Sequence, residues 1–517
     1  MNVPDAGRLT SRTRALVFAL LAVALVAATH WQVLGLGFRT DDYATEVREA
    51  LTGVWSGTRA FQDPYHRPLT GLYHAAQFAL FGVSAMPLHA VSLLELAVVV
   101  WLFLQALWHE APRPAALAGA LVYVVQPLLR DSTSAWVFNQ FHLLSLLIVL
   151  AAVRAWQHRR HDLRLRAWGP VFAWLALGAF VKEDVLLTLP ALLVVQHVRA
   201  RWLGDVPAPT RALWAGAGAV TVAVVLAHAM AVPLFGALRE HGALSWEERA
   251  LSLGYALLRP FFARAHDALV PLGTLLLAGA PIAALVACMR KPSPAVAALT
   301  LTGGVLLIAW AAPLALQPTP STTRVHLVTL AAAWLASAGL LAIADALRRA
   351  PAIARAAALA VCVAAIGSLH SAALAAQGDL YSACAPAQIT GDAEASAWPI
   401  TSDDVRAYLT RKAAGCAAGA PIEALAHTPT LTWPRPNGAT VLVALGPDAH
   451  TVHLRDPDAS ADHPREVIVD APGRRVAITL RSSAPQFVDV RLAPTWRDRV
   501  RGAVRIDVEA DGPVLVR

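Results

Sequence analysis

Charged residues are scarce in this 517-residue chain, in which Asp, Glu, Lys and Arg together make up only 15% of the sequence. Ordinary soluble domains carry about 25% charged residues and about 45–50% apolar ones. Here 56% of the residues are hydrophobic and the mean hydropathy is +0.51. This imbalance excludes a soluble globular protein and predicts one that crosses a membrane several times.

Cysteine is also scarce, because the chain has only 4, too few for a small domain held together by disulfides. Cys288 and Cys362 fall inside apolar runs and are expected to be small core residues. Cys384 and Cys416 lie in a polar tail and could pair if that tail faces an oxidising compartment. A secretory cleavage site is lacking after the first apolar run, so we expect this run to be retained as a membrane span.

Internal repeats and spaced metal ligands are lacking as well. No sequence repeat appears at solenoid periods. Neither His66 nor His89 has a partner His or Cys at ligand spacing, so both are expected to be polar packing residues rather than metal ligands. The net charge of +8 comes mostly from arginines between apolar runs, where such residues orient helices in a bilayer. We therefore expect a membrane partner and no nucleic acid.

Long apolar runs are what the chain has in abundance. A helix needs about 20 apolar residues to span a bilayer, and on that measure eleven spans are expected. They cover residues 15–36, 87–108, 114–129, 136–156, 168–181, 185–196, 212–232, 268–289, 294–316, 325–347 and 352–374. The fifth and sixth are short and flank Lys182-Glu183-Asp184, which allows either one re-entrant unit or two spans that extend further.

Arginine is concentrated in short connections that follow every second span. Cytoplasmic loops carry such an excess of positive charge, so the pattern predicts a cytoplasmic N-terminus. By the same parity, Asp41-Asp42, Lys182, Arg324 and the C-terminal tail lie on the extracytoplasmic side. A bacterial inner membrane is the expected location.

The predicted fold is an all-α polytopic membrane domain of about eleven transmembrane helices over residues 1–374, with a small extracytoplasmic β-rich domain. Its first outer loop covers residues 38–86 and contains a semi-apolar helical pattern between Thr70 and Leu80, typical of an interfacial helix. Residues 375–436 are expected to form a linker. Over residues 437–517, β-branched runs recur between Pro, Gly and Asp turns and predict a β-sandwich-like domain.

The first outer loop carries the chemistry. An ionisable residue at a membrane is a functional candidate by default, and Asp41 and Asp42 directly follow the first span. They could equally cap the helical stretch that follows them. Arg67 places a fixed positive charge before the next apolar run and suits a phosphate, because its guanidinium is planar and always charged; otherwise it is an interfacial arginine with a buried stem.

Two further cations are expected on the same side. Lys182, one of 3 lysines, either binds a phosphate or pairs with Glu183. Arg324 is either a second phosphate ligand or an ordinary loop cation.

Several short motifs occur in an order that resembles the GT-C superfamily of integral membrane glycosyltransferases. Within it, the chain is most similar to glycosyltransferase family 39 and related O-mannosyltransferases. The motifs that carry the resemblance are Thr40-Asp41-Asp42-Tyr43, Tyr65-His66-Arg67-Pro68-Leu69, Phe78-Ala79-Leu80-Phe81-Gly82, Leu88-His89, Gln126-Pro127, Ala135-Trp136, Val181-Lys182-Glu183, Leu189-Pro190 and Thr323-Arg324-Val325-His326-Leu327.

The resemblance implies inverting transfer of a sugar from a polyprenyl-phosphate donor to a hydroxyl acceptor. Asp41 would be the general base, and Asp42 would orient the acceptor or bind a divalent cation, with no other cofactor expected. Arg67, Lys182 and Arg324 would stabilise the phosphate as charge builds on the leaving group. The remaining pocket residues would be Tyr43, Tyr65, His66, His89, Asn139, Gln140 and Glu183.

The chain departs from the family at Asn139-Gln140, where relatives often have an arginine, which leaves the donor and the acceptor open. A different class of function is a transporter or flippase for a lipid-linked or anionic substrate. Such a protein is expected to show charges near the bilayer midplane, interrupted helices and repeated halves. The sequence shows its charges mainly at one membrane face and no similar halves, which favours the enzyme.

Overall fold

The computed structural model forms two compact units, one of helices and one of strands. It describes the helical unit over residues 11–35, 67–81, 85–129, 137, 139–231, 246–265, 268–290, 292–316, 326–348 and 350–375, and the strand unit over 439–444, 452–455, 465–471, 474–480, 486–488, 503–510 and 515–516. The linker predicted at 375–436 lies outside these residues, apart from its first.

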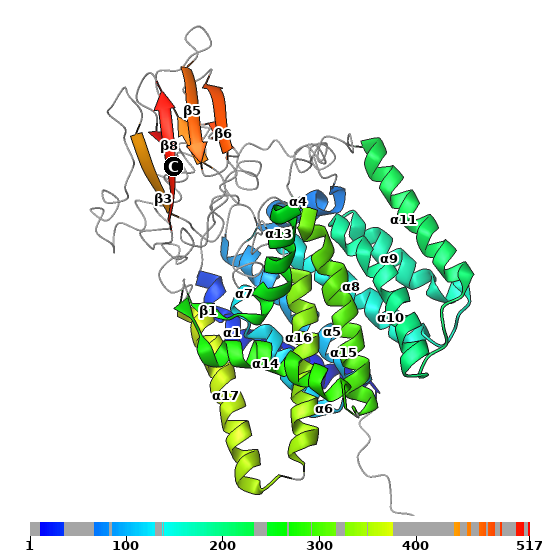
Figure 1. Cartoon of the computed structure of the whole chain (residues 1–517). Coiled ribbons are helices and arrows are strands. Elements are labelled where there is room, and N and C mark those ends of the chain that lie inside the picture. Colours follow the sequence, from blue (N-terminus) through cyan, green and yellow to red (C-terminus); the bar gives the residue numbers. More distant parts are fainter. Residues whose placement is uncertain are drawn as a thin grey trace, which may run out of the picture. The chain divides into compact units, whose positions relative to one another are not determined.

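The helical unit consists mainly of α-helices and short 3-10 helices (Figure 1). Its elements are α1 (Ser11–His30), η1 (Trp31–Gly35), α4 (Pro68–Phe81), α5 (Ala85–Glu110), α6 (Arg113–Val124), α7 (Pro127–Leu129), α8 (Gln140–Arg159), η4 (Leu165–Trp168), α9 (Gly169–Ala179), η5 (Glu183–Leu187), α10 (Thr188–Trp202), α11 (Arg211–Ala231), α13 (Trp246–Leu258), η6 (Arg259–Phe261), β1 (Arg264–Ala265), β2 (Ala268–Leu269), α14 (Pro271–Cys288), α15 (Pro294–Ala311), η7 (Ala312–Leu316), α16 (His326–Leu347) and α17 (Ala352–Ala375).

Every predicted apolar run contains a helix, but eight of the helices in the described residues, rather than eleven, are long and apolar enough to cross a membrane. The exceptions are α6, α9 and α10, with 12, 11 and 15 residues. At 1.5 Å per residue they extend about 16 to 23 Å, short of the roughly 30 Å hydrocarbon core. Eight of the eleven predicted spans are confirmed by this measure, and the other three stay a prediction, because α6, α9 and α10 taken alone are shorter than the hydrocarbon core.

Helix α16 lies at the centre of the unit, with 83% of its candidate span buried. It packs against α14, α15 and α6. The crossing with α14 requires a glycine, because a Cβ added at Gly339 would lie 1.7 Å from the backbone oxygen of Ala280. Small residues allow membrane helices to approach this closely. Ser337, half a turn earlier, donates to the Ala115 carbonyl at 2.9 Å and ties α16 to α6.

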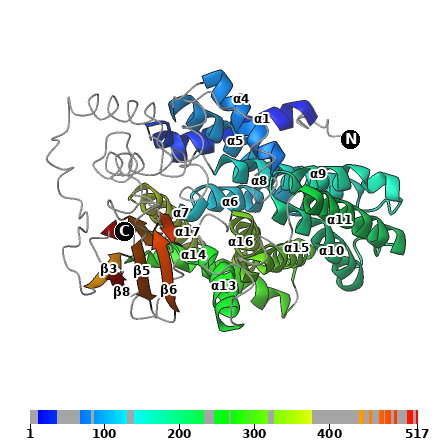
Figure 2. The same ribbon diagram turned by 90° about the horizontal axis from the view of Figure 1, so that it is seen from above.

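The helices at the periphery expose their apolar side chains. Only 17% of the α11 span and 11% of the α17 span are buried inside the unit. Figure 2 shows α9, α10 and α11 side by side at one edge, which agrees with their mutual contacts. Exposed leucines, valines and isoleucines on such helices fit a hydrocarbon surrounding better than water.

The strand unit contains two antiparallel sheets. One has the order β3-β8-β5-β6 and the other β7-β4-β9. Their strands are β3 (Ala439–Ala444), β4 (Val452–Arg455), β5 (Arg465–Ala471), β6 (Arg474–Leu480), β7 (Gln486–Val488), β8 (Ala503–Ala510) and β9 (Leu515–Val516). The predicted strands are thus present, and the sandwich-like arrangement of the two sheets stays a prediction.

Candidate functional site

The start of α4 is docked on the end of α9. The Leu69 backbone N–H donates to the Phe180 carbonyl at 3.3 Å, and the Thr70 hydroxyl donates to the Val181 carbonyl at 2.8 Å. Pro68 suits the first turn of α4, since that position has no need of a backbone N–H. This junction brings Arg67 beside the turn that starts at Lys182.

Arg67 and Glu183 form a two-point ion pair across this junction. The Arg67 Nε and Nη2 atoms donate to the two Glu183 carboxylate oxygens at 2.9 and 2.6 Å. The Arg67 side chain is 15% exposed and that of Glu183 is 48% exposed. Burial acts to raise the pKa of Glu183, but the charge and hydrogen bonds of Arg67, with Lys182 nearby, lower it to about 2. The carboxylate is therefore ionised at physiological pH.

Lys182 is paired with Asp184. The Lys182 Nζ donates to Asp184 Oδ2 at 2.6 Å, and both side chains are largely buried. Burial lowers the pKa of Lys182, and the two neighbouring carboxylates oppose that change. The sequence offered Glu183 as the partner of Lys182, whereas the structure gives Asp184 to Lys182 and Glu183 to Arg67. Among the described residues, two cations and two carboxylates thus lie together at this junction.

Aromatic rings from α8 and α16 continue this cluster into the helical core. The Arg67 guanidinium carbon lies 5.4 Å from the centre of the Phe141 ring, a cation–π distance. The Phe141 ring meets His142 edge-on at 4.2 Å, and His142 stacks on His326 at 4.2 Å with 11° between the planes. The Ser145 hydroxyl lies 3.2 Å from His326 Nε2. The charged junction is therefore continuous with a buried imidazole pair.

Three predicted pocket residues are buried at helix contacts close to this junction. Gln140 donates through Nε2 to the Leu88 carbonyl at 2.7 Å and to the Ser92 hydroxyl at 2.6 Å, which ties α8 to α5. Asn139, at the N-cap of α8, and His89 are both buried. Their positions fit packing as well as substrate contact.

The other predicted site residues lie outside the part of the chain that the structure describes. They are Asp41, Asp42, Tyr43, Tyr65, His66 and Arg324. Their roles stay predictions. Among the described residues, no group of three or more His, Cys, Asp or Glu side chains could hold a metal ion.

Sequence reasoning missed Asp184, Phe141, His142 and His326 as members of the cluster. Two signals were available. Asp184 continues the charged run Lys182-Glu183, and a histidine within an apolar run is unusual enough to mark a functional candidate. The contact between His142 and His326 had no signal in the sequence, because the residues come from helices far apart along the chain.

No family model matches the chain, and a search of curated proteins finds no match. Solved structures give low similarity. The apo oligosaccharyltransferase of Archaeoglobus fulgidus is 13% identical with a TM-score of 0.46, and the match covers 79% of this chain and 60% of that one. The same organism's oligosaccharyltransferase AglB, in complex with an inhibitory peptide and a dolichol-phosphate, is 13% identical with a TM-score of 0.44, over 78% and 60% of the two chains.

A third similar structure is ArnT from Cupriavidus metallidurans bound to undecaprenyl phosphate. It is 12% identical with a TM-score of 0.45, and the match covers 84% of this chain and 94% of that one. By contrast, the present chain spans only 60% of the length of the oligosaccharyltransferase.

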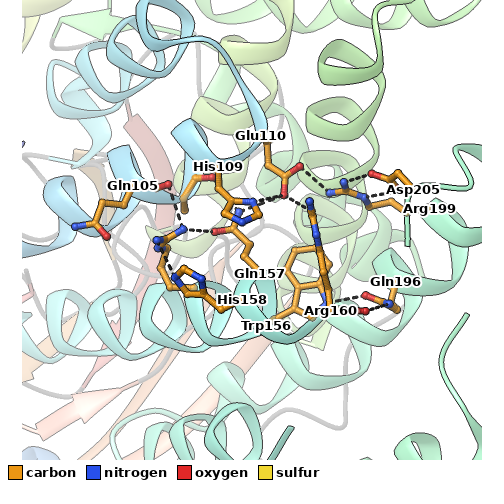
Figure 3. Close-up of polar contacts among 12 residues, drawn as sticks. Gln105, His109, Glu110, Trp156, Gln157, His158, Arg160, Gln196, Arg199 and Asp205 are labelled. Atoms are coloured by element: carbon orange, nitrogen blue, oxygen red, sulfur yellow. Dashed lines mark hydrogen bonds and ion pairs between the residues drawn. The ribbon is translucent and has the colours of Figure 1, made fainter. Parts of the chain in front are cut away.

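A second polar network lies at the C-terminal ends of α5, α8 and α10, away from the Arg67 junction (Figure 3). Glu110, at the end of α5, accepts hydrogen bonds from Arg160 at 2.6 Å and from Arg199 at 3.0 Å. Arg199 also pairs with Asp205, and its side chain is 1% exposed. Sequence reasoning interpreted these arginines only as orientation signals and did not consider Glu110. A carboxylate that ends an apolar run was the signal that could have found the network.

Proposed function

We propose that the chain is an inverting membrane glycosyltransferase of the GT-C type, similar to family 39, which moves a sugar from a polyprenyl-phosphate donor to a hydroxyl acceptor. The observation that carries this proposal is the junction of α4 with α9. It sets Arg67 and Lys182 at one end of the helical unit, where a phosphate carried by a membrane lipid would lie.

Departure of a lipid phosphate needs positive charge where negative charge develops on the phosphate oxygens. A guanidinium held by a carboxylate is already oriented and loses little freedom when it binds. The two bonds from Arg67 to Glu183 fix the plane of the guanidinium. In this proposal the Glu183 pair orients Arg67, and a donor phosphate engages the same guanidinium.

Lys182 supplies the second cation in the proposal. Its ammonium lies within the same short turn and is held by Asp184. Arg324, which precedes α16, would supply a third phosphate contact. The stacked His142 and His326 would form the floor beneath the donor headgroup, since they join the charged junction through Phe141.

The acceptor side of the proposed reaction rests on the first outer loop. Asp41 would remove the proton from the acceptor hydroxyl as it attacks the sugar C1. The bond between C1 and the phosphate oxygen breaks on the opposite face, which inverts the anomeric centre. Asp42 would orient the acceptor or bind a divalent cation, and Tyr43, Tyr65 and His66 would line the pocket.

A transporter or flippase is the second candidate, because one carboxylate lies within a candidate span. Glu95 of α5 accepts a hydrogen bond from the Tyr73 hydroxyl of α4 at 2.5 Å. An intramembrane carboxylate is typical of substrate or ion pathways. Sequence reasoning placed the charges mainly at one membrane face and did not consider this residue.

The test is to incubate the purified full-length protein with a panel of polyprenyl-phosphate sugars and candidate hydroxyl acceptors. We expect one donor to be consumed and a product of opposite anomeric configuration to appear. A parallel assay in sealed vesicles measures whether labelled lipid changes leaflet without sugar transfer. Transbilayer movement with no consumption of any donor, requiring Glu95, would favour the transporter and overturn the enzyme proposal.

A further inference from the structure

The polar network at the far end of α5 and α8 holds more positive than negative charge. Figure 3 shows Arg160, Arg199, Glu110 and Asp205 of this network. Arg154 joins it through a hydrogen bond to Gln157, whose amide lies 3.4 Å from Glu110. Glu110 is only 3% exposed and is shared by Arg160 and Arg199. Both carboxylates are therefore already engaged by other arginines.

Arg154 contacts no carboxylate among the described residues. Its Nη1 donates to Gln157 Oε1 at 2.9 Å and to the Gln105 carbonyl at 3.3 Å, and its Nη2 lies 3.1 Å from His158 Nε2. Since Nε2 of His158 receives an N–H from Arg154, the proton of a neutral ring is on Nδ1. Both groups retain a capacity to donate to an anion.

His109 packs against His158, and its Nδ1 lies 3.5 Å from Glu110 Oε1. The two rings meet edge-on with centroids 5.9 Å apart, and the His109 side chain is 29% exposed. The His158 side chain is exposed, whereas Arg154 is half-buried. We call Arg154, His158 and His109 the basic cluster. It places one guanidinium and two imidazoles on an accessible edge between α5 and α8.

The position of the basic cluster selects the kind of anion. The candidate spans in α5 and α8 end at Glu110 and Arg159. In a bilayer, the cluster near these ends would lie at the headgroup layer. Along α8, the exposed His158 is about 27 Å from Gln140, which lies beside the Arg67 junction, a separation close to the roughly 30 Å thickness of a hydrocarbon core. Nearby, Arg113 lies over the Trp108 ring at 4.7 Å, and tryptophan is enriched at membrane interfaces.

We infer that the basic cluster binds the headgroup phosphate of an anionic phospholipid in the leaflet opposite the Arg67 junction. Arg154 supplies the charge, and His158 donates to the phosphate oxygens through Nδ1. Basic pockets between membrane helices bind anionic headgroups in this way. The site is independent of the proposed sugar transfer, because it uses different residues at the other end of the helices.

Native mass spectrometry of the full-length protein in neutral detergent tests the inference. The protein is mixed with phosphatidylglycerol or with phosphatidylcholine, and the retained lipid is counted. We expect phosphatidylglycerol to be retained in preference to phosphatidylcholine. Arg154→Gln should lower the retained phosphatidylglycerol about fivefold, since each basic residue near a membrane surface strengthens the binding of anionic lipid by about that factor. His158→Ala should also reduce it, and this variant removes an exposed side chain whose hydrogen bond is to Arg154.

The matched control is Arg164→Gln. Arg164 lies near the same end of α8, but it is 65% exposed and held by Asp162. It should leave retention unchanged. Equal losses in Arg164→Gln and Arg154→Gln would indicate diffuse attraction and overturn the site. Displacement of the lipid by millimolar inorganic phosphate would identify a soluble anion as the ligand and overturn the lipid assignment, as would unchanged retention in both cluster variants.

Discussion

Ion pairs of arginine or lysine with carboxylates occur at both ends of α5, α8 and α10, but they differ in burial and in how the carboxylates are shared. At the Arg67 junction each cation has its own carboxylate, and Glu183 is 48% exposed. At the far end one carboxylate, Glu110, serves two arginines and is 3% exposed. A pair with one solvent-exposed partner, such as Arg67 with Glu183, contributes less to stability than a fully buried pair. A buried shared carboxylate holds three segments together and is costly to remove.

This difference indicates which charged side chains are available to bind a ligand. A ligand phosphate can compete for Arg67 at little cost, whereas competition for Arg199 would leave Glu110 buried with one partner fewer. We therefore expect changes at the Arg67 end to alter activity with little effect on stability, and changes at Glu110 to do the reverse.

The largest expected effect is on the proposed general base. Asp41→Asn should abolish sugar transfer, because the amide cannot accept the acceptor proton. Expression and thermal unfolding should stay near those of the unaltered protein. Donor consumption by the purified variant measures sugar transfer. An active Asp41→Asn enzyme would contradict the assignment of Asp41 as the general base.

The next effect tests Arg67 as a phosphate ligand. Arg67→Ala should lower transfer about 10²- to 10³-fold, the usual loss when one donor to a developing anion is removed. The loss should appear in donor use more than in acceptor use, which steady-state kinetics with each substrate varied can separate. Equal weakening toward both substrates would count against the phosphate role, and Arg164→Gln serves as the control for general loss of charge.

At the far end, Glu110→Gln should destabilise the protein by about 3–5 kcal/mol, because it leaves two buried arginines without their shared charge. Thermal unfolding in detergent measures this effect. The matched variant is Asp162→Asn, which removes an exposed carboxylate paired with Arg164. It should change the melting temperature little, and a Glu110→Gln protein as stable as that control would remove the distinction between the two ends.

The smallest effect concerns pH. The folded pKa of Glu183 is lowered to about 2, below its ordinary value of 4.5. A carboxyl group with a lowered folded pKa stabilises the fold above its unfolded pKa, and the contribution is lost as pH falls through the folded value. As the pH falls from about 4.5 to 2, the Glu183→Gln variant should therefore lose slightly less unfolding free energy than the unaltered protein.

Arg67→Gln should produce the same smaller loss, since Arg67 is the main cause of the lowered pKa. Acid titration of thermal unfolding compares the two variants. If the melting temperature falls with pH in both variants as steeply as in the unaltered protein, the pair does not contribute to stability.

Much of the helical unit could be predicted from the sequence, because a long apolar run in a membrane has few alternatives to a helix. All eleven runs contain one, and Thr70 to Leu80 falls within α4. The tail strands were also predictable from alternating β-branched residues between turns. The lengths of the helices were harder to predict, since α6, α9 and α10 are individually shorter than a full span.

The candidate site shows the same division. Arg67 and Lys182 stood out in the sequence because they are charges beside apolar runs. Their partners did not, since a choice between Glu183 and Asp184 depends on how a tight turn directs each side chain.

The sequence by itself determined that residues 1–374 are mainly apolar and helical, roughly where the helices of the eleven apolar runs lie, and which charges flank them. Those properties depend on local periodicity and on transfer of side chains from water. Only the tertiary structure decided that His142 stacks on His326, that Gly339 lies against Ala280, and that Glu110 is shared by two arginines. Such contacts join residues far apart in the chain, and their geometry arises only when the helices pack.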